Sequence, residues 1–254
     1  MRAFLLPAVA ITLLLTAACG AGSEDAAPER DGTTPTSQPS SEPTTEPTTA
    51  PVPAADPVIA QVPVEQWEAM VTAGMVRPGC PVTRRNQLRT LDINYVDFDG
   101  LVQRGQLVAN VDTVDSLSRI FTQLFNQGFP IASMVSLENF QGDSNLSLQA
   151  NNTAAFNCRR LDQINAPTME SPHANGRAVD INPLQNPWMD LRCSCWSPSS
   201  EYAARTPGPG KIFKGTAAHR LFIDEGWIWQ NIKVADYMHF DTGYPSQPLP
   251  ASAS

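Results

Sequence analysis

The chain has 254 residues, of which 42% are hydrophobic and 17% are charged, enough for one ordinary domain or two small ones. The formal net charge is −8, and most of the acidic excess lies in residues 20–57. The rest of the chain is therefore only mildly acidic. Because binding to a phosphate backbone needs clustered Lys and Arg, this distribution argues against a nucleic-acid partner.

The first residues have the features of a secretion signal, which we assign to residues 1–18. Arg2 gives a positive start, and the apolar run from Phe4 to Leu15 is too short to span a bilayer comfortably. The small residues before Cys19 resemble a bacterial lipoprotein signal, which implies cleavage before Cys19 and lipidation of its thiol. The alternative is an ordinary secretory signal with an incidental cysteine. We expect an extracytoplasmic protein, held on the membrane by its lipid and facing the cell wall.

Residues 19–57 are expected to form a disordered tether. Eight of the 23 prolines lie in this segment, which has no aromatic residue. Such a composition cannot bury enough apolar surface to offset the entropy of ordering the chain, and proline keeps it extended. The segment would serve either as a spacer that lifts a domain into the cell wall or as a plain solvated linker.

The remaining chain, residues 58–254 with a core at about 88–246, is expected to form one α+β domain. Residues 91–95 alternate between apolar and polar, which predicts a strand, and apolar residues at helical spacing predict a helix over 114–127. Further helices are expected at 64–75 and 216–225, and further strands at 107–111, 130–136, 154–159, 227–229 and 237–240. Helices and strands mix without a regular βαβ repeat, which favours a small antiparallel sheet with flanking helices.

Four cysteines besides Cys19 fit an oxidising compartment: Cys80, Cys158, Cys193 and Cys195. Three pairings into two disulfides are possible. A bridge between Cys193 and Cys195 would close a very small ring and strain its geometry. We therefore favour a pairing in which Cys80 and Cys158 each join one of the other two. The alternative is a structural zinc site on Cys193 and Cys195, although their one-residue spacer is shorter than usual for such sites.

Two of the three histidines lie in short polar motifs. His173 and Asp180 lie within residues 171–182, and His239 follows Asp236 by three residues. Imidazole and carboxylate groups are good zinc ligands, and a catalytic zinc keeps three protein ligands and a water molecule. His173, Asp180 and His239 would supply such a set. Zinc lowers the pKa of its bound water, and Asp236 would take the proton.

These motifs resemble a known enzyme family. The pattern Ser-x-His-x-x-Gly-x-Ala-x-Asp-Ile from Ser171, followed by Asp-x-x-His-Phe from Asp236, is similar to the zinc D-alanyl-D-alanine carboxypeptidase and L-alanyl-D-glutamate endopeptidase family. The similarity extends from about Leu91 to Phe240 and also includes residues 98–100, 151–159, 182–183 and 226–229. The resemblance implies a small α+β fold whose antiparallel sheet holds zinc through His173, Asp180 and His239.

The same resemblance implies roles for residues around the metal. Asp236 would be the general base and later the general acid, and Arg159 would contact the substrate carboxylate or the developing oxyanion. Ser171 would assist by hydrogen bonding. Arg160 adjoins Arg159, so the choice between these two arginines stays open. Residues 230–233 differ from the turn expected in relatives, which leaves one wall of the cleft undefined.

We therefore expect a monomeric zinc enzyme that hydrolyses a peptide bond in peptidoglycan stem peptides. The bond would be the one cleaved either by a D-Ala-D-Ala carboxypeptidase or by an L-Ala-D-Glu type endopeptidase. The alternative is a tethered domain that retains zinc and binds wall peptides without cleaving them. Asp236 favours the enzyme, because a binding protein has no need of a base. His219, Trp227 and Trp229 are expected to be structural.

Overall fold

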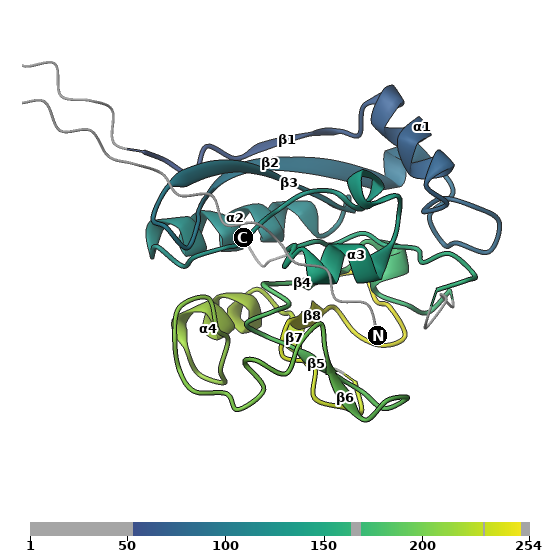
Figure 1. Cartoon of the computed structure of the whole chain (residues 1–254). Helices are drawn as coiled ribbons and strands as arrows, with labels where there is room; N and C mark the ends of the chain where they lie inside the picture. Colours follow the sequence, from purple (N-terminus) through teal and green to yellow (C-terminus); the bar gives the residue numbers. More distant parts are fainter. Residues whose placement is uncertain (1–52, 164–168, 231, 250–254) are drawn as a thin grey trace, which may run out of the picture. The chain divides into compact units, whose positions relative to one another are not determined.

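The computed structural model describes residues 53–163, 169–230 and 232–249 and has an α+β fold (Figure 1). The predicted signal peptide, Cys19 and most of the predicted tether lie outside the described residues. The last tether residues are described: Ala55 is buried, and its carbonyl accepts a hydrogen bond from the Asn94 backbone N–H at 2.8 Å. The packed chain therefore begins a few residues before 58. Among the described residues, no helix is long and apolar enough to cross a membrane.

The largest sheet is antiparallel and has the order β1-β2-β3. Its strands are β1 (Val58–Gln61), β2 (Leu88–Val96) and β3 (Val102–Asn110). Leu91 and Ile93 are fully buried, as the alternation of apolar and polar residues predicts. The carboxylate of Asp97 accepts hydrogen bonds from the backbone N–H groups of Asp99 and Leu101. These bonds close the tight turn between β2 and β3.

The helices predicted from apolar spacing are present. The helices are α1 (Val64–Thr72), α2 (Val114–Asn126), α3 (Ser144–Gln149) and α4 (Ala217–Asp224). Figure 1 shows α2 against one face of the large sheet, and its Leu117, Phe121 and Leu124 are buried there. The sequence did not predict α3, which has only six residues. Asp143 caps the start of this helix: its carboxylate accepts hydrogen bonds from the N–H groups of Asn145 and Leu146.

The second half of the described chain contains two small sheets, which are also antiparallel. One has the order β4-β8-β7 and the other is a hairpin of β5 and β6. The strands are β4 (Ala178–Asp180), β5 (Trp188–Asp190), β6 (Cys195–Ser197), β7 (Ile228–Trp229) and β8 (His239–Asp241). Three short 3-10 turns lie at Arg85–Gln87, Leu137–Phe140 and His173–Asn175.

The strands predicted at 130–136 and 154–159 are wrong. Each segment makes only isolated bridges, at Pro130, Ser133 and Ala154. Proline has no backbone N–H to donate to a ladder, so the first segment is poorly suited to continuous pairing. Apolar residues in both segments are nevertheless buried, because they pack into the two apolar clusters of the fold.

The predicted disulfide pairing is also wrong. The disulfides are Cys80–Cys158, with the Cα atoms 6.1 Å apart, and Cys193–Cys195, with the Cα atoms 5.1 Å apart. Cys80 and Cys158 meet in a buried apolar cluster with Met70 and Phe156, an encounter that sequence spacing does not reveal. Ser194 has a left-handed φ of 52°, which allows the chain to close the short ring. Since all four cysteines are paired, they do not form the alternative zinc site.

One apolar core joins the large sheet to the small sheet of β4, β8 and β7. Leu91 and Phe121 share this core with Val179 of β4 and Phe240 of β8. Trp227 belongs to it as well: its side chain is 2% exposed and its Nε1–H donates to the Ser116 hydroxyl at 2.9 Å. The core therefore holds the short strands against a larger scaffold.

Candidate metal centre

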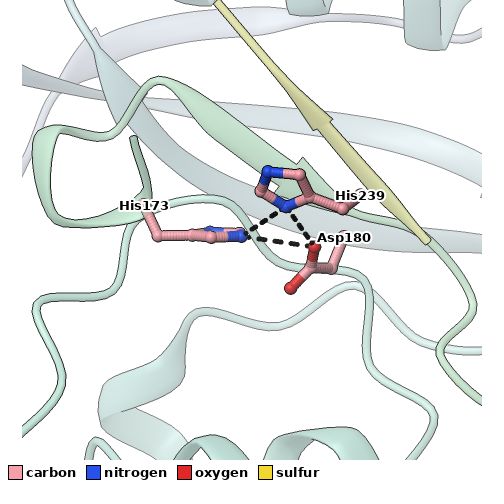
Figure 2. Close-up of side chains that lie close together, drawn as sticks. All are labelled: His173, Asp180 and His239. Atoms are coloured by element: carbon pink, nitrogen blue, oxygen red, sulfur yellow. Dashed lines mark hydrogen bonds and ion pairs between the residues drawn. The ribbon is translucent and has the colours of Figure 1, made fainter. Parts of the chain in front are cut away.

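Three side chains from the two sequence motifs converge on one point (Figure 2). The Nε2 atom of His173 lies 3.2 Å from Oδ1 of Asp180 and 3.1 Å from Nδ1 of His239. The third side of the triangle, from His239 Nδ1 to Asp180 Oδ1, is also 3.1 Å. Among the described residues, these three form the group of His, Cys, Asp and Glu side chains that could hold a metal ion.

Strand register brings two of these side chains together. Asp180 ends β4 and His239 begins β8, and the two residues are direct partners in the antiparallel pairing. Side chains of directly paired residues lie on the same face of a sheet. Asp180 is held on its other side by Ala154, since the two residues exchange backbone hydrogen bonds of 2.9 and 3.1 Å. The position of the carboxylate is therefore fixed by backbone on both sides.

His173 comes from the 3-10 turn at His173–Asn175. The turn ends at Gly176, which has a φ of 69°, a conformation that favours glycine. A Cβ atom at Gly176 would lie 2.8 Å from the Asn110 backbone nitrogen, so the close approach also requires glycine. The Gly176 carbonyl accepts hydrogen bonds from the Asn110 N–H and the Thr113 hydroxyl. These contacts tie the turn to the end of β3.

A second layer of hydrogen bonds orients both imidazoles. Nδ1 of His173 lies 2.8 Å from the carbonyl oxygen of Ala155, and Nε2 of His239 lies 3.0 Å from Oδ2 of Asp241. A carbonyl oxygen only accepts, so the outer nitrogen of His173 carries the proton. The carboxylate of Asp241 is 0% exposed and accepts in the same way from His239. Such outer partners fix the tautomer and strengthen a metal-ligating histidine.

The donor set fits a metal cation. With their outer nitrogens protonated, both neutral imidazoles direct lone pairs inward, where they meet the carboxylate oxygen of Asp180. Three acceptor atoms about 3 Å apart repel one another unless a cation or a proton lies between them. Two imidazoles and one carboxylate, with room for a further ligand, are typical of catalytic zinc.

The pKa shifts agree with strong coupling inside the group. Burial opposes ionisation of Asp180, but the two adjacent imidazoles outweigh it and hold the pKa of this carboxyl below its usual value. Burial also disfavours the charged form of His239, yet hydrogen bonds to Asp180 and Asp241 raise the pKa of His239 to about 10. The same inward lone pair of His239 that favours a proton would favour a metal cation.

Asp236 is a buried carboxylate beside this group. Its Oδ1 atom is inaccessible to solvent and has no hydrogen-bond partner within the described part of the chain. Burial raises the pKa of Asp236 to about 7, against the opposing influence of His239. A buried carboxyl with a pKa near neutrality and an unsatisfied oxygen is suited to accept and return a proton.

Arg159 and Arg160 occupy different surroundings. Arg159 lines a pocket together with His173 and Asp180, and burial lowers its pKa despite the nearby charges of Asp180 and Asp236. Arg160 instead forms ion pairs with Asp143 and Asp162 away from these ligands. Of the two arginines, Arg159 is therefore the one that lines the pocket of the candidate metal group.

The rest of the pocket lining includes four polar residues as well as leucines and alanines. Three of the polar residues are Ser144 and Ser147 from α3, and Asn157. The Asn157 amide donates to the Ser144 hydroxyl at 2.8 Å, and the Asn157 backbone N–H donates to the His173 carbonyl at 3.0 Å. The segment that carries Arg159 is thus connected directly to the turn that carries His173.

Two further residues have structural contacts. The Ser171 hydroxyl accepts a hydrogen bond from the Ala174 N–H at 3.3 Å, so it stabilises the turn that positions His173. His219 lies on α4, with its ring edge-on to Trp229 at a centroid distance of 5.2 Å. His219 is outside the metal group, as predicted from the sequence. Trp229 is partly buried, and its Nε1–H donates to the Tyr237 carbonyl.

The second layer of the site, formed by Asp241 and the carbonyl of Ala155, was not predicted from the sequence. Asp241 could have been found, because it follows His239 by two residues and residues two apart on a strand share a face. The Ala155 carbonyl leaves no such signal, since any residue type carries the same backbone oxygen.

Comparison with known families supports the motif. Residues 165–242 match the profile of a family described as D-alanyl-D-alanine carboxypeptidase. No curated protein and no solved structure matches the chain. The matched segment contains His173, Asp180, Asp236 and His239, whereas Arg159 precedes it. The match therefore supports the peptidase family for the segment that carries the metal group.

Proposed function

We propose that the protein is a zinc metallopeptidase that hydrolyses a peptide bond in peptidoglycan stem peptides. The observation that carries this proposal is the triangle of His173, Asp180 and His239, oriented by outer hydrogen bonds and flanked by the buried Asp236. The family match over residues 165–242 supports this substrate class. Either a D-Ala-D-Ala carboxypeptidase or an L-Ala-D-Glu type endopeptidase is compatible with this site.

When bound, zinc supplies a Lewis acid that polarises the scissile carbonyl and acidifies a water molecule. Asp236 takes the proton of the attacking water and later delivers it to the leaving amine. Its raised pKa of about 7 suits both directions of transfer, because neither the acid nor the carboxylate form is strongly favoured near neutral pH.

Arg159 positions the substrate in this proposal. Its guanidinium lines the pocket beside His173 and Asp180, where it would pair with a substrate carboxylate or the developing oxyanion. A fixed cation in a site shielded from water stabilises negative charge more strongly than it does in bulk solvent. Ser171 acts indirectly, through the turn that holds His173.

The proposed location is the cell envelope. A lipid on Cys19 would anchor the protein to the membrane, and the segment up to residue 57 would connect the anchor to the folded domain. The support for this location is the signal-like sequence of residues 1–19. The peptide substrate is found in the same compartment.

The alternative is a domain that binds zinc and wall peptides without cleavage. Asp236 argues against it, because a buried carboxyl with an unsatisfied oxygen carries a desolvation cost. A binding domain would gain nothing from bearing that cost beside the metal, whereas a hydrolase uses the group in each turnover.

The test is hydrolysis of purified muropeptides by the full-length, zinc-loaded protein, with product masses identifying the bond. We expect cleavage that a chelator abolishes and added zinc restores. Arg159→Ala should lower kcat/KM by about 100-fold or more, the scale of losing one oxyanion-stabilising group, and Arg160→Ala is the matched control with little effect. A zinc-loaded protein that leaves every stem-peptide bond intact would contradict the proposal.

A further inference from the structure

The hairpin of β5 and β6 carries a disulfide that the proposed reaction does not use. Cys193 and Cys195 are both exposed, whereas Cys80 and Cys158 are only 2% and 0% exposed. Thiol–disulfide exchange requires a thiolate to reach one of the two sulfur atoms. The two disulfides should therefore differ in reactivity toward a thiolate. Cys193–Cys195 can be attacked in the folded protein, whereas Cys80–Cys158 is shielded.

The same hairpin is attached to the segment that carries Asp236. Trp188 of β5 and Asp236 form an antiparallel bridge. The neighbouring Met189 N–H donates to the Ala235 carbonyl at 2.8 Å. Figure 1 shows β5 and β6 next to β7 and β8, the strands of the metal-bearing sheet. Displacement of β5 would therefore alter the backbone on which Asp236 lies.

Side chains strengthen this attachment. The Trp196 ring of β6 stacks on the Tyr237 ring, with centroids 5.5 Å apart and planes inclined by 17°. The Arg205 guanidinium lies 4.2 Å from the centroid of the same tyrosine. Tyr237 immediately follows Asp236, so packing of the hairpin restricts the residue next to the proposed base.

Strand pairing within the hairpin is short. Its two strands pair over only three positions, from Trp188↔Ser197 to Asp190↔Cys195. An isolated two-stranded hairpin is marginally stable at best, and residues 191–194 at its tip are exposed. A covalent link between Cys193 and Cys195 limits the conformations open to this tip.

We propose that Cys193–Cys195 is a thiol–disulfide exchange site whose disulfide form holds the β5–β6 hairpin against the Asp236 segment. A dithiol reductant supplies the two electrons. Its thiolate attacks one sulfur, the Cys193–Cys195 bond breaks, and the released sulfur takes a proton. The second thiol of the reductant then resolves the mixed disulfide, which leaves two cysteine thiols and an oxidised reductant. The exchange is independent of the proposed hydrolysis; only its consequence for Asp236 as a base rests on that function.

The first experiment measures the exchange. The folded full-length protein is treated with dithiothreitol, quenched with an alkylating reagent at intervals and mapped by mass spectrometry. We expect Cys193 and Cys195 to be labelled at least about tenfold faster than Cys80 and Cys158, because reactivity follows access. Equal rates, or earlier labelling of the buried pair, would overturn the proposal.

The second experiment measures the coupling by hydrogen exchange. The Met189 and Tyr237 amides, which donate to Ala235 and Pro187, should exchange about tenfold faster after reduction, since protection reports local opening. The double variant Cys193→Ser/Cys195→Ser should show the same increase without reductant, and the Ile93 amide of β2 serves as the unaffected control. Unchanged protection at Met189 and Tyr237 would refute the coupling. Faster exchange in a protein that hydrolyses no muropeptide would refute the proposed function and leave the coupling intact.

Discussion

The large sheet with α2 and the small sheet of β4, β8 and β7 are built in different ways. β2 and β3 pair over nine positions, and regular apolar patterns bury their side chains against α2. β4 and β8 pair over only three positions, yet they carry Asp180 and His239. Their geometry depends on the common core, on the backbone hydrogen bonds between Asp180 and Ala154, and on the hydrogen bond between His239 and Asp241.

The region that contributes most to folding stability is therefore different from the region that carries the proposed chemistry. The large sheet buries apolar area, which is the main favourable contribution to folding. The small sheet places buried charge around one point, which is costly without a counter-ion. Substitutions in the two regions should therefore have different effects. A change in the large sheet should lower the free energy of unfolding, and a change in the metal group should lower activity or metal affinity.

The largest expected effect is at Asp236. Asp236→Asn removes the proton acceptor but keeps the size of the side chain, so muropeptide turnover should fall by about 10²–10⁴-fold, the range for loss of a general base. Zinc content and the denaturation midpoint should stay close to those of the wild type. A variant that keeps wild-type turnover would show that another group moves the proton.

The counterpart in the scaffold is Leu91, which is fully buried in β2. Leu91→Ala should reduce the free energy of unfolding by about 2–5 kcal/mol, measured by chemical denaturation, because it leaves a cavity in the core. Turnover per folded molecule should not change under conditions where the protein remains folded. A loss of turnover with unchanged stability would contradict the separation of the two regions.

A smaller effect is expected at Asp241, the outer partner of His239. Asp241→Asn keeps an acceptor oxygen but removes the charge, so zinc affinity should fall by roughly 10–100-fold, as is usual for outer-layer partners. Competition with a chromogenic chelator measures this change. An affinity equal to that of the wild type would mean that Asp241 does not orient the ligand.

The smallest effect, for a change of one pH unit, is the pH dependence of zinc binding. The pKa of His239 in the metal-free protein is about 10, above its ordinary value of 6.5, so His239 carries a proton that zinc must displace. Higher pH removes this competition. The apparent zinc affinity should rise about tenfold per pH unit between about pH 6 and 8, with release of one proton.

The raised pKa of His239 also determines how the stability of the metal-free protein changes with pH. The pKa of His239 is higher in the folded chain than in the unfolded chain, so its contribution is fully present below about pH 6.5 and is lost as the pH rises toward 10. His239→Gln should remove that dependence. Calorimetry at several pH values, with a chelator present, compares the stability of the two proteins. A zinc affinity that does not change with pH, or a stability that does not change with pH, would contradict the assignment of the proton to His239.

The sequence predicted the regular parts of the fold and the inner residues of the site. Strong periodicity located β2 and α2, and motif spacing located His173, Asp180 and His239. Short elements such as β4 and α3 lack enough residues to show a period. The Cys80–Cys158 pairing was missed because it depends on packing between segments 78 residues apart. Asp241 was not predicted because it lies immediately after the motif, which ends at Phe240.

The central claim is that His173, Asp180 and His239 hold a single catalytic zinc. A crystal of the zinc-loaded protein, with data collected on both sides of the zinc absorption edge, tests it most directly. We predict one anomalous peak at about 2.0–2.2 Å from His173 Nε2, Asp180 Oδ1 and His239 Nδ1, the usual zinc–ligand distances. A peak at other residues, or no peak at this triangle in a fully loaded protein, would contradict the account.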